Sequence, residues 1–129
     1  MSHFSTIKTE LRDRQALLEA LRDLGLDPRE GALPVRGYRG QTLEAQLAVA
    51  QPNGADIGFR FDPETGSYEL VTDLDLWKQP VPVERFIAQL NQRYALRTIL
   101  AASAEEGFQV SEQIQQQDGT IELVVTRWA

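Results

Sequence analysis

The segment LEAQLAVAQPNGADIGFRFDPETGSYELVT, residues 43–72, decides the fold because it contains three alternating stretches separated by two turn sequences. Apolar and polar residues alternate in each stretch, as expected for β-strands with one covered face. The intervening QPNG and DPETG combine proline with Asn-Gly or with a late glycine, and both combinations favour tight turns. The segment therefore predicts an antiparallel β-meander.

The lengths of the two turns predict the register of this meander. If PNG forms a three-residue loop, the first two strands pair Val49 with Ile57, Leu47 with Phe59, Ala45 with Phe61 and Gln46 with Arg60. If PETG forms the next loop, the last two strands pair Phe59 with Leu70, Phe61 with Tyr68 and Arg60 with Glu69. Both registers gather the large apolar side chains on one face, and a shift of one residue would expose them.

Further elements are predicted before the meander. FSTIKTEL, residues 4–11, is typical of a strand, and Asp13 can cap a helix over residues 14–24 that Gly25 ends. LDPREGALP, residues 26–34, contains two prolines and a glycine and indicates a loop. PVRGYR is then expected to form a strand beside residues 43–47.

Helical periodicity begins at Val83, and it changes side within the segment. Phe86, Ile87, Leu90 and Tyr94 share one face, whereas Leu96, Ile99 and Leu100 lie on nearly the opposite face. This predicts a break or kink near residues 94–96; alternatively, the second stripe faces a partner. After Gly107, residues 108–115 and 120–128 are predicted strands, joined by QQDG, whose Asp-Gly fits a type I′ turn.

The predicted element order is β-α-β-β-β-β-α-β-β. Runs of strands beside two helical regions indicate an α+β fold rather than alternating βαβ units. We therefore expect a single domain, residues 1–129, in which a mainly antiparallel sheet of meander and C-terminal hairpin packs against the helical regions.

VRGYRG, residues 35–40, is the first candidate site, and it has two interpretations. Its G-x-x-G spacing resembles a nucleic-acid clamp, but that clamp joins two helices. A strand followed by a turn fits the extended flanks better. Arg36 and Arg39 would point to opposite faces of an extended strand, so one of them must pair with an acid or serve a ligand. The candidate contact residues are Arg36, Tyr38, Arg39 and, in a later loop, Trp77, which either plugs the core edge or marks a protein contact.

Composition excludes several chemistries. The net charge of −6 repels phosphate backbones, which makes nucleic acid an unlikely partner. The chain has no cysteine, and its one histidine, His3, cannot form a multi-histidine metal site. A Ser-His-Asp triad would have to depend on this residue at the third position of the chain. No nucleotide-binding glycine motif and no membrane-spanning apolar run occur. We therefore expect no catalytic residue, no metal and no cofactor. A set of acids is expected to form a solvated rim: Asp62, Glu64, Glu69, Asp73 and Asp75.

Several stretches together resemble one known family. MSHFSTIKTEL, ALRDLG, VRGYRGQT, DIGF, YELVTD, QRYA, EGF and DGTIELVVTRW follow in order along nearly the whole chain. In this combination they are similar to the hypothetical chloroplast open reading frame thirty-five family of cyanobacteria and algal plastids. TDLDLW departs from the tryptophan-richer ADWW of similar proteins, which puts a role for Trp77 in doubt. The resemblance implies the cytoplasm of a cyanobacterium or a plastid stroma, and it implies no catalytic residue.

The leading functional hypothesis is a small non-enzymatic interaction or accessory protein that binds another protein. The alternative is a small-ligand or nucleotide-binding domain in which Arg36 or Arg39 holds an anion. Nucleic-acid binding ranks third. Sequence alone predicts neither the partner nor the oligomeric state.

Overall fold

The computed structural model describes residues 3–115 and 121–127. Along the chain the elements are β1 (Phe4–Lys8), α1 (Arg14–Asp23), β2 (Arg29–Arg36), the 3-10 turn η1 (Tyr38–Gly40), β3 (Thr42–Ala50), β4 (Asp56–Asp62), β5 (Ser67–Asp73), the 3-10 turn η2 (Leu74–Leu76), α2 (Val83–Glu105), β6 (Phe108–Gln115) and β7 (Ile121–Arg127). This order confirms the α+β class and the predicted succession of strands and helices.

Five strands form one antiparallel sheet in the order β1-β5-β4-β3-β2. The predicted register of β4 and β5 is confirmed, from Phe59 opposite Leu70 to Asp62 opposite Ser67. Between β3 and β4 it is confirmed only as far as Leu47 opposite Phe59. The predicted pairs of Ala45 with Phe61 and of Gln46 with Arg60 are wrong. At this point the backbone N–H of Phe61 donates to the Gln46 side chain at 2.7 Å, so a side chain replaces the next ladder bond.

The sheet carries apolar side chains on both faces. One face, with a fully buried Phe59, packs against α1 and α2 in the main core. The other face has a smaller cluster that the sequence pattern did not predict, formed by Val35, Ala45, Ala48 and Val71 with Phe4, Leu33 and Leu43 beside it. Gly58 permits this second cluster, because a Cβ at that position would collide with Val35 Cγ2 and lie 2.9 Å from Val71 Cγ2.

Strand β2 begins earlier than expected. The predicted loop over residues 26–34 is wrong in its second half, because β2 already pairs with β3 from Arg29 onward. The register shifts between Glu30 and Leu33, and Gly31 within the shift has φ of +128°. Such a bulge lets a glycine and a proline lie in a strand at the edge of a sheet.

Helix α1 is fixed at its N-terminus by two side chains. Asp13 caps it as predicted, accepting a hydrogen bond from the Ala16 N–H at 3.0 Å. The hydroxyl of Tyr94 on α2 accepts from the backbone N–H groups of Arg12 and Asp13, at 3.0 and 2.8 Å. Because helix N-termini leave such donors without intrahelical partners, Tyr94 ties α1 to α2.

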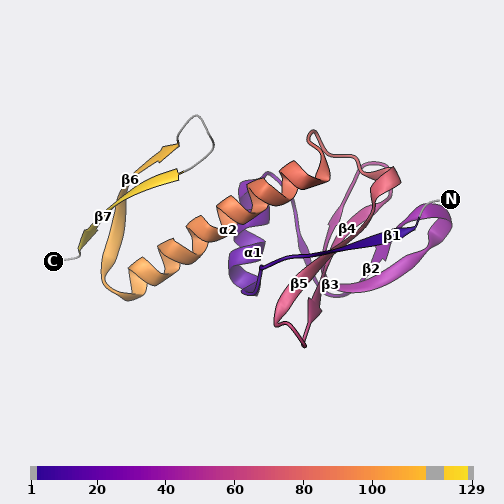
Figure 1. Ribbon diagram of the computed structural model, residues 1–129, viewed down its shortest axis with the longest axis horizontal. Coiled ribbons are helices and arrows are strands. Elements are labelled where there is room, and N and C mark those ends of the chain that lie inside the picture. Colours follow the sequence, from indigo (N-terminus) through magenta and orange to yellow (C-terminus); the bar gives the residue numbers. More distant parts are fainter. Residues whose placement is uncertain (1–2, 116–120, 128–129) are drawn as a thin grey trace.

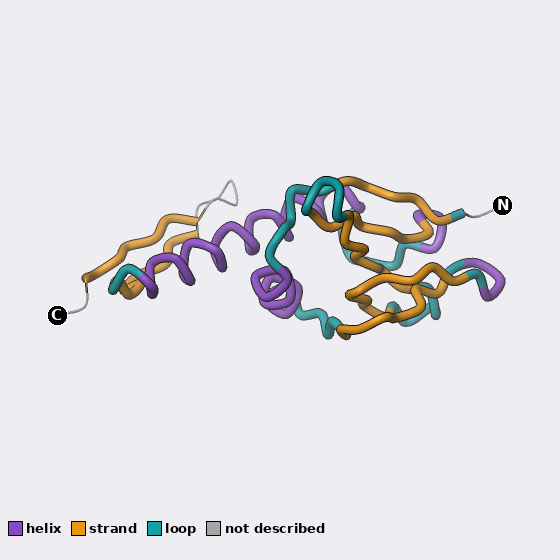
Figure 2. Tube along the Cα trace, turned by 90° about the horizontal axis from the view of Figure 1, so that it is seen from below, coloured by secondary structure: helices purple, strands orange, loops and turns teal. Residues whose placement is uncertain are grey.

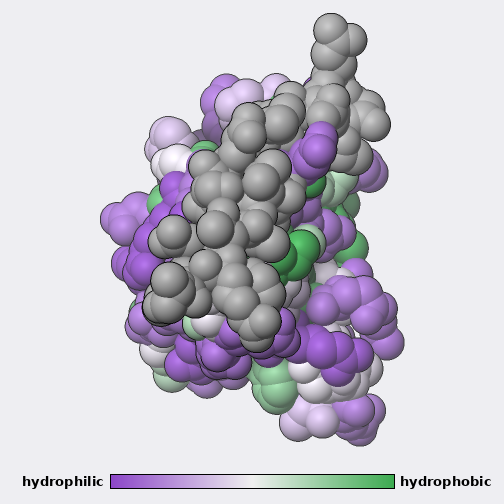
Figure 3. Space-filling view, turned by 90° about the vertical axis from the view of Figure 1, so that its left-hand side faces the viewer, coloured by the Kyte–Doolittle hydropathy of each residue, from purple (hydrophilic) through white to green (hydrophobic). Residues whose placement is uncertain are grey.

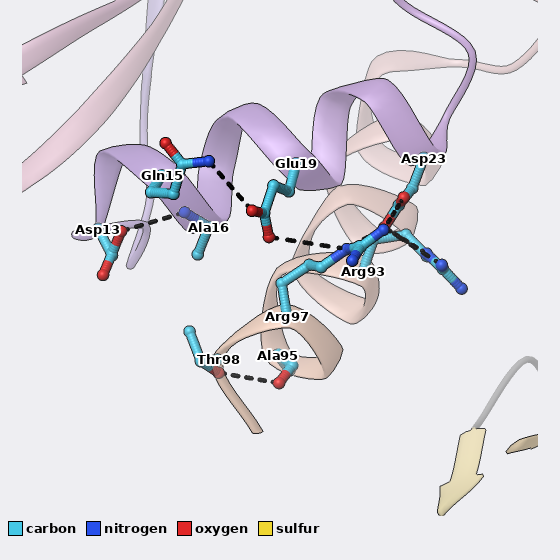
Figure 4. Close-up of polar contacts among 9 residues, drawn as sticks. All are labelled: Asp13, Gln15, Ala16, Glu19, Asp23, Arg93, Ala95, Arg97 and Thr98. Atoms are coloured by element: carbon cyan, nitrogen blue, oxygen red, sulfur yellow. Dashed lines mark hydrogen bonds and ion pairs between the residues drawn. The ribbon is translucent and has the colours of Figure 1, made fainter. Parts of the chain in front are cut away.

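Figure 4 shows a second tie between the helices, near the C-terminus of α1. The Asp23 carboxylate accepts hydrogen bonds from Arg97, at 2.8 Å to Nε, and from Arg93, at 3.2 Å to Nη2. Glu19 on the same face of α1 approaches Arg97 at 4.0 Å. Polar clamps thus hold both ends of α1 against α2.

Helix α2 runs unbroken through all 23 of its residues, so the predicted break near residues 94–96 is wrong (Figure 1). No break is needed, because different elements cover different lengths of the helix. Its first half packs against the main core, whereas β6 and β7 contact it further along (Figure 2). Leu96 is buried while Ile99 keeps about half of its side chain exposed, 48%.

The predicted C-terminal hairpin exists as a backbone pairing of β6 with β7, but it forms a two-stranded sheet of its own. It therefore does not extend the meander as expected, because α2 carries it beyond the five-stranded sheet (Figure 1). The predicted Asp-Gly turn lies outside the described residues. Around the hairpin end, the coloured surface in Figure 3 is mainly hydrophilic, with hydrophobic residues between. Within the described part of the chain, no helix is long and apolar enough to cross a membrane.

Candidate binding site at one end of the sheet

The candidate site lies where β2 ends, β4 begins and β5 ends. A strand followed by a turn is present in VRGYRG, as predicted, but the strand does not extend to Arg39. Arg36 is the last residue of β2, and Tyr38–Gly40 form the turn η1, in which Arg39 has a left-handed rather than an extended backbone. Phe4, at the start of β1, packs over Gly37, where a Cβ would stand only 2.7 Å from the Phe4 ring. The structure thus brings Arg36, Tyr38 and Arg39 together at one end of the sheet.

Arg36 is held by an acid that sequence reasoning missed. Its Nε and Nη2 each donate to a different oxygen of Asp56 at 2.9 Å, and its backbone N–H donates at 2.8 Å. The Asp56 side chain is fully buried, whereas half of the Arg36 side chain is exposed. Burial alone would raise the pKa of Asp56, but the hydrogen bonds and charge of Arg36 outweigh it and lower that pKa. Arg36 is therefore first a structural partner of Asp56.

Arg39 occupies a strained position at the tip of the same turn. It has φ of 53° and ψ of 41°, the left-handed region that costs a residue with a Cβ about 1–2 kcal/mol. Gly40 follows with φ of +76°, and the Gly37 N–H donates to the Gln41 carbonyl at 2.8 Å across the turn. The Arg39 guanidinium lies 5.1 Å from the centroid of the Tyr38 ring. Among the described residues, Arg39 has no acidic partner within salt-bridge distance.

Asp73 is a second buried acid at this end of the sheet. It lies opposite Phe4 across β1 and β5, and only 1% of it is exposed. One carboxylate oxygen accepts from the Asp75 N–H at 3.1 Å, while Oδ2 has no hydrogen-bond partner within the described residues. The expected solvated rim is thus wrong at Asp73, because this residue is buried at the end of β5 instead of being exposed to solvent. The predicted pair of Arg60 with Glu69 is present at 3.0 Å.

Trp77 lies apart from the other candidate residues. Its indole N–H donates to the Val81 carbonyl at 2.8 Å, and its ring meets Phe86 edge-on at 5.2 Å. It thereby packs against the main core, on the face of the sheet away from the cluster around Val35. This placement agrees with the interpretation of Trp77 as a plug at the core edge. A partner contact through Trp77 stays a prediction.

The sequence carried only weak signals that Asp56 and Asp73 are buried. Asp56 alternates with Gly58 and Arg60 in ADIGFRF, on a face that the pattern assigned to solvent. Asp73 stood in a run of acids that favoured a solvated surface. Within the described part of the chain, no three His, Cys, Asp or Glu side chains gather in a way that could hold a metal ion.

The comparisons with known proteins cover almost the full length. Residues 20–124 match the family model described as "Protein of unknown function (DUF1257)". The chain is 39% identical over 128 residues to "Uncharacterized protein ycf35" of Guillardia theta, covering 99% of this chain and 98% of that protein. Proteins of the same name from Pyropia yezoensis and Cyanophora paradoxa are each 37% identical over the same shares of both chains. No solved structure matches the chain. The chain therefore belongs to the DUF1257 family, together with these ycf35 proteins.

Proposed function

We propose that this protein is a non-enzymatic interaction protein that binds an acidic segment of a partner protein through the turn at Tyr38–Gly40. The observation that carries the proposal is Arg39, a strained, exposed arginine with no acidic partner among the described residues. Strained backbone concentrates at functional sites, because elsewhere a residue that tolerates the conformation would serve better. Asparagine or glycine would fit this turn without strain.

The neighbouring residues support a protein partner over a small anion. Arg36 would be needed as a second cationic grip on a phosphate, but its guanidinium already makes two hydrogen bonds to Asp56. Arg39 therefore acts as a single charge beside the Tyr38 ring. Arginine and tyrosine are both enriched at protein–protein contacts. Trp77 is left outside the proposed contact surface because it packs on the other face of the sheet. The proposed place of action is the cytoplasm or the plastid stroma, as the family resemblance implies.

The test compares three forms of the full chain as bait in extracts of the cells that express it. Arg39→Asn removes the charge and fits the left-handed conformation, so it should keep or raise stability by about 0.5–1 kcal/mol while losing the partner. Arg85→Gln removes the same charge from an exposed site on α2 and serves as the matched control. A protein recovered with the wild type and with R85Q, but not with R39N, supports the proposal.

Two outcomes would contradict this function. The same set of proteins recovered with all three baits would show that the Arg39 turn is not the contact. A thermal shift of the wild type, but not of R39N, with inorganic phosphate or a nucleotide would favour the small-anion alternative.

A further inference from the structure

The outer edge of β1 carries backbone groups that face no other strand among the described residues. In residues 3–115 and 121–127, β1 lies at one edge of the five-stranded sheet and pairs only with β5. Both backbone groups of Tyr68 on β5 point toward the β1 side. Its N–H donates to the Leu11 carbonyl, and its C=O accepts from the Thr9 hydroxyl. Along a strand, the backbone N–H and C=O groups of every second residue point to the same side. The backbone groups of Leu70 and Thr72 therefore also face β1, where these residues pair with Ile7 and Ser5. The backbone groups of Phe4, Thr6 and Lys8 therefore point away from the sheet.

The two edges of the sheet are protected to different degrees. β2, at the other edge, contains the bulge between Glu30 and Leu33, and it contains Pro34, which has no N–H to offer. Bulges and prolines are devices that keep a sheet edge from pairing with another chain. β1 contains neither a bulge nor a proline, and its register with β5 is regular from Phe4 to Lys8, so its charged Lys8 is the one feature of the strand that would disfavour pairing with another chain. β1 is therefore the edge at which a further strand can be added.

We propose that the strand added to β1 is β1 of a second copy of this chain, in an antiparallel pair with Thr6 at the two-fold axis. Two-fold symmetry then places Phe4 opposite Lys8 of the second copy and Ser5 opposite Ile7. In this register each outward-facing residue meets an outward-facing residue, so all three can exchange backbone hydrogen bonds. A shift of the register by two residues leaves fewer such pairs.

The side chains of β1 are complementary to themselves in this register. Lys8, the one charged residue of the strand, lies opposite Phe4 of the second copy rather than opposite its own counterpart. A lysine beside an aromatic ring gains a cation–π contact, whereas two opposing lysines would repel each other. Thr6 is exposed and β-branched, and it meets its own copy at the axis. Charge and hydrogen-bond direction thus favour the same register and the same occupant.

Cysteine substitution tests the register directly, because the natural chain has no cysteine. Directly opposed, hydrogen-bonded residues have Cα atoms about 5.5 Å apart, within the range that a disulfide spans. Thr6→Cys should therefore give a covalent dimer under mild oxidation. Lys8→Cys is the matched control on the same strand. Each introduced cysteine would lie opposite Phe4 of the second copy, four residues from the other cysteine, so no disulfide should form. Comparable cross-linking of both variants would overturn the proposed register.

Proline substitution tests the edge itself. Thr6→Pro removes an N–H that points outward, while the bonds of Ser5 and Ile7 to β5 remain. We expect sedimentation equilibrium of the wild type to show a concentration-dependent dimer, and T6P to weaken it about tenfold or more. Circular dichroism reports whether T6P keeps its fold, and the T6C result stands if it does not. A wild type that stays monomeric at every concentration would overturn the proposal. The same holds if the Thr6 amide is protected from hydrogen exchange only when a different protein is bound.

Discussion

Asp56 and Asp73 begin and end neighbouring strands at the same end of the sheet, yet their surroundings differ. Asp56 accepts three hydrogen bonds from Arg36, which supply the donors that a buried carboxylate needs. Asp73 accepts one bond from Asp75 through Oδ1, and its Oδ2 is buried without a partner in the described part of the chain. Residue type and burial are the same, so the number of donors decides what each acid contributes.

Replacing each acid by asparagine should therefore give different results. Asp56→Asn sets an N–H₂ group against the Arg36 donors and should lower the free energy of unfolding by about 1.5–3 kcal/mol. Asp73→Asn keeps an acceptor for the Asp75 N–H and replaces only the oxygen that has no hydrogen-bond partner among the described residues, so stability should change little. Urea denaturation at pH 7 measures both. An equal loss in the two variants would show that Asp73 Oδ2 has a donor.

Helices α1 and α2 are joined by Asp23, a carboxylate whose pKa is lowered in the folded protein. The hydrogen bond from Arg97 lowers the pKa of Asp23, with the charge of Arg97 and the contact with Arg93 adding to it, and burial opposes the shift. Because the pKa is lowered in the folded state, the unfolded chain binds this proton more readily. The stabilisation from Asp23 is thus present above its unfolded pKa of about 3.9, and it is lost as the pH falls through the lowered folded value.

We therefore expect Asp23→Asn to reduce the dependence of stability on pH below about 4. The substitution should cost stability at pH 7, and the curve of the variant should approach that of the wild type under acid conditions. Denaturant unfolding measured in steps from pH 6 to pH 2.5 checks this. Asp27→Asn, an exposed change in the loop after α1, is the control and should leave the shape of the curve unchanged. Some pH dependence should remain in both variants, because Arg36 also lowers the pKa of Asp56.

At the scale of the whole molecule, α2 connects two separate sheets. The five-stranded sheet has cores on both faces, whereas the hairpin of β6 and β7 contacts α2 (Figure 1). A two-stranded hairpin has little stability of its own and depends on such packing. The hairpin should thus open locally at a lower free energy than the five-stranded sheet.

A chain that ends after Glu106 should accordingly keep the five-stranded sheet folded. We expect its amide resonances for β1–β5 to remain dispersed and close to those of the full chain. In the full chain, hydrogen exchange should be faster in β6 and β7 than in β4 and β5. Loss of dispersed resonances on truncation would show that the hairpin is needed for the main core.

The sequence alone determined the features that depend on neighbours along the chain. The turns at residues 52–54 and 63–66 set the β-meander registers, and Gly54 and Gly66 adopt positive φ there, at +80° and +72°. The Asp13 cap, the α+β class and the family resemblance also followed from the sequence. VRGYRG was correctly assigned to a strand followed by a turn, because extended flanks and glycines favour both locally, but the strand ends at Arg36 instead of continuing to Arg39.

Only the tertiary structure decided which distant groups meet. The pairing order alone would keep Arg36 and Asp56 apart, because they lie beside opposite ends of β3, at Thr42 and at Ala50. They meet because the end of β2 crosses one face of the sheet, where Val35 lies over Gly58 of β4. Asp73 is buried at the end of β5, where it lies opposite Phe4 of β1. Helix α2 stays unbroken because the main core packs against its first half and the hairpin against its later part. An apolar pattern specifies that a face is buried, but not which element buries it. Partners between non-adjacent strands depend on the sheet order and on how its edges come together, which no local pattern encodes.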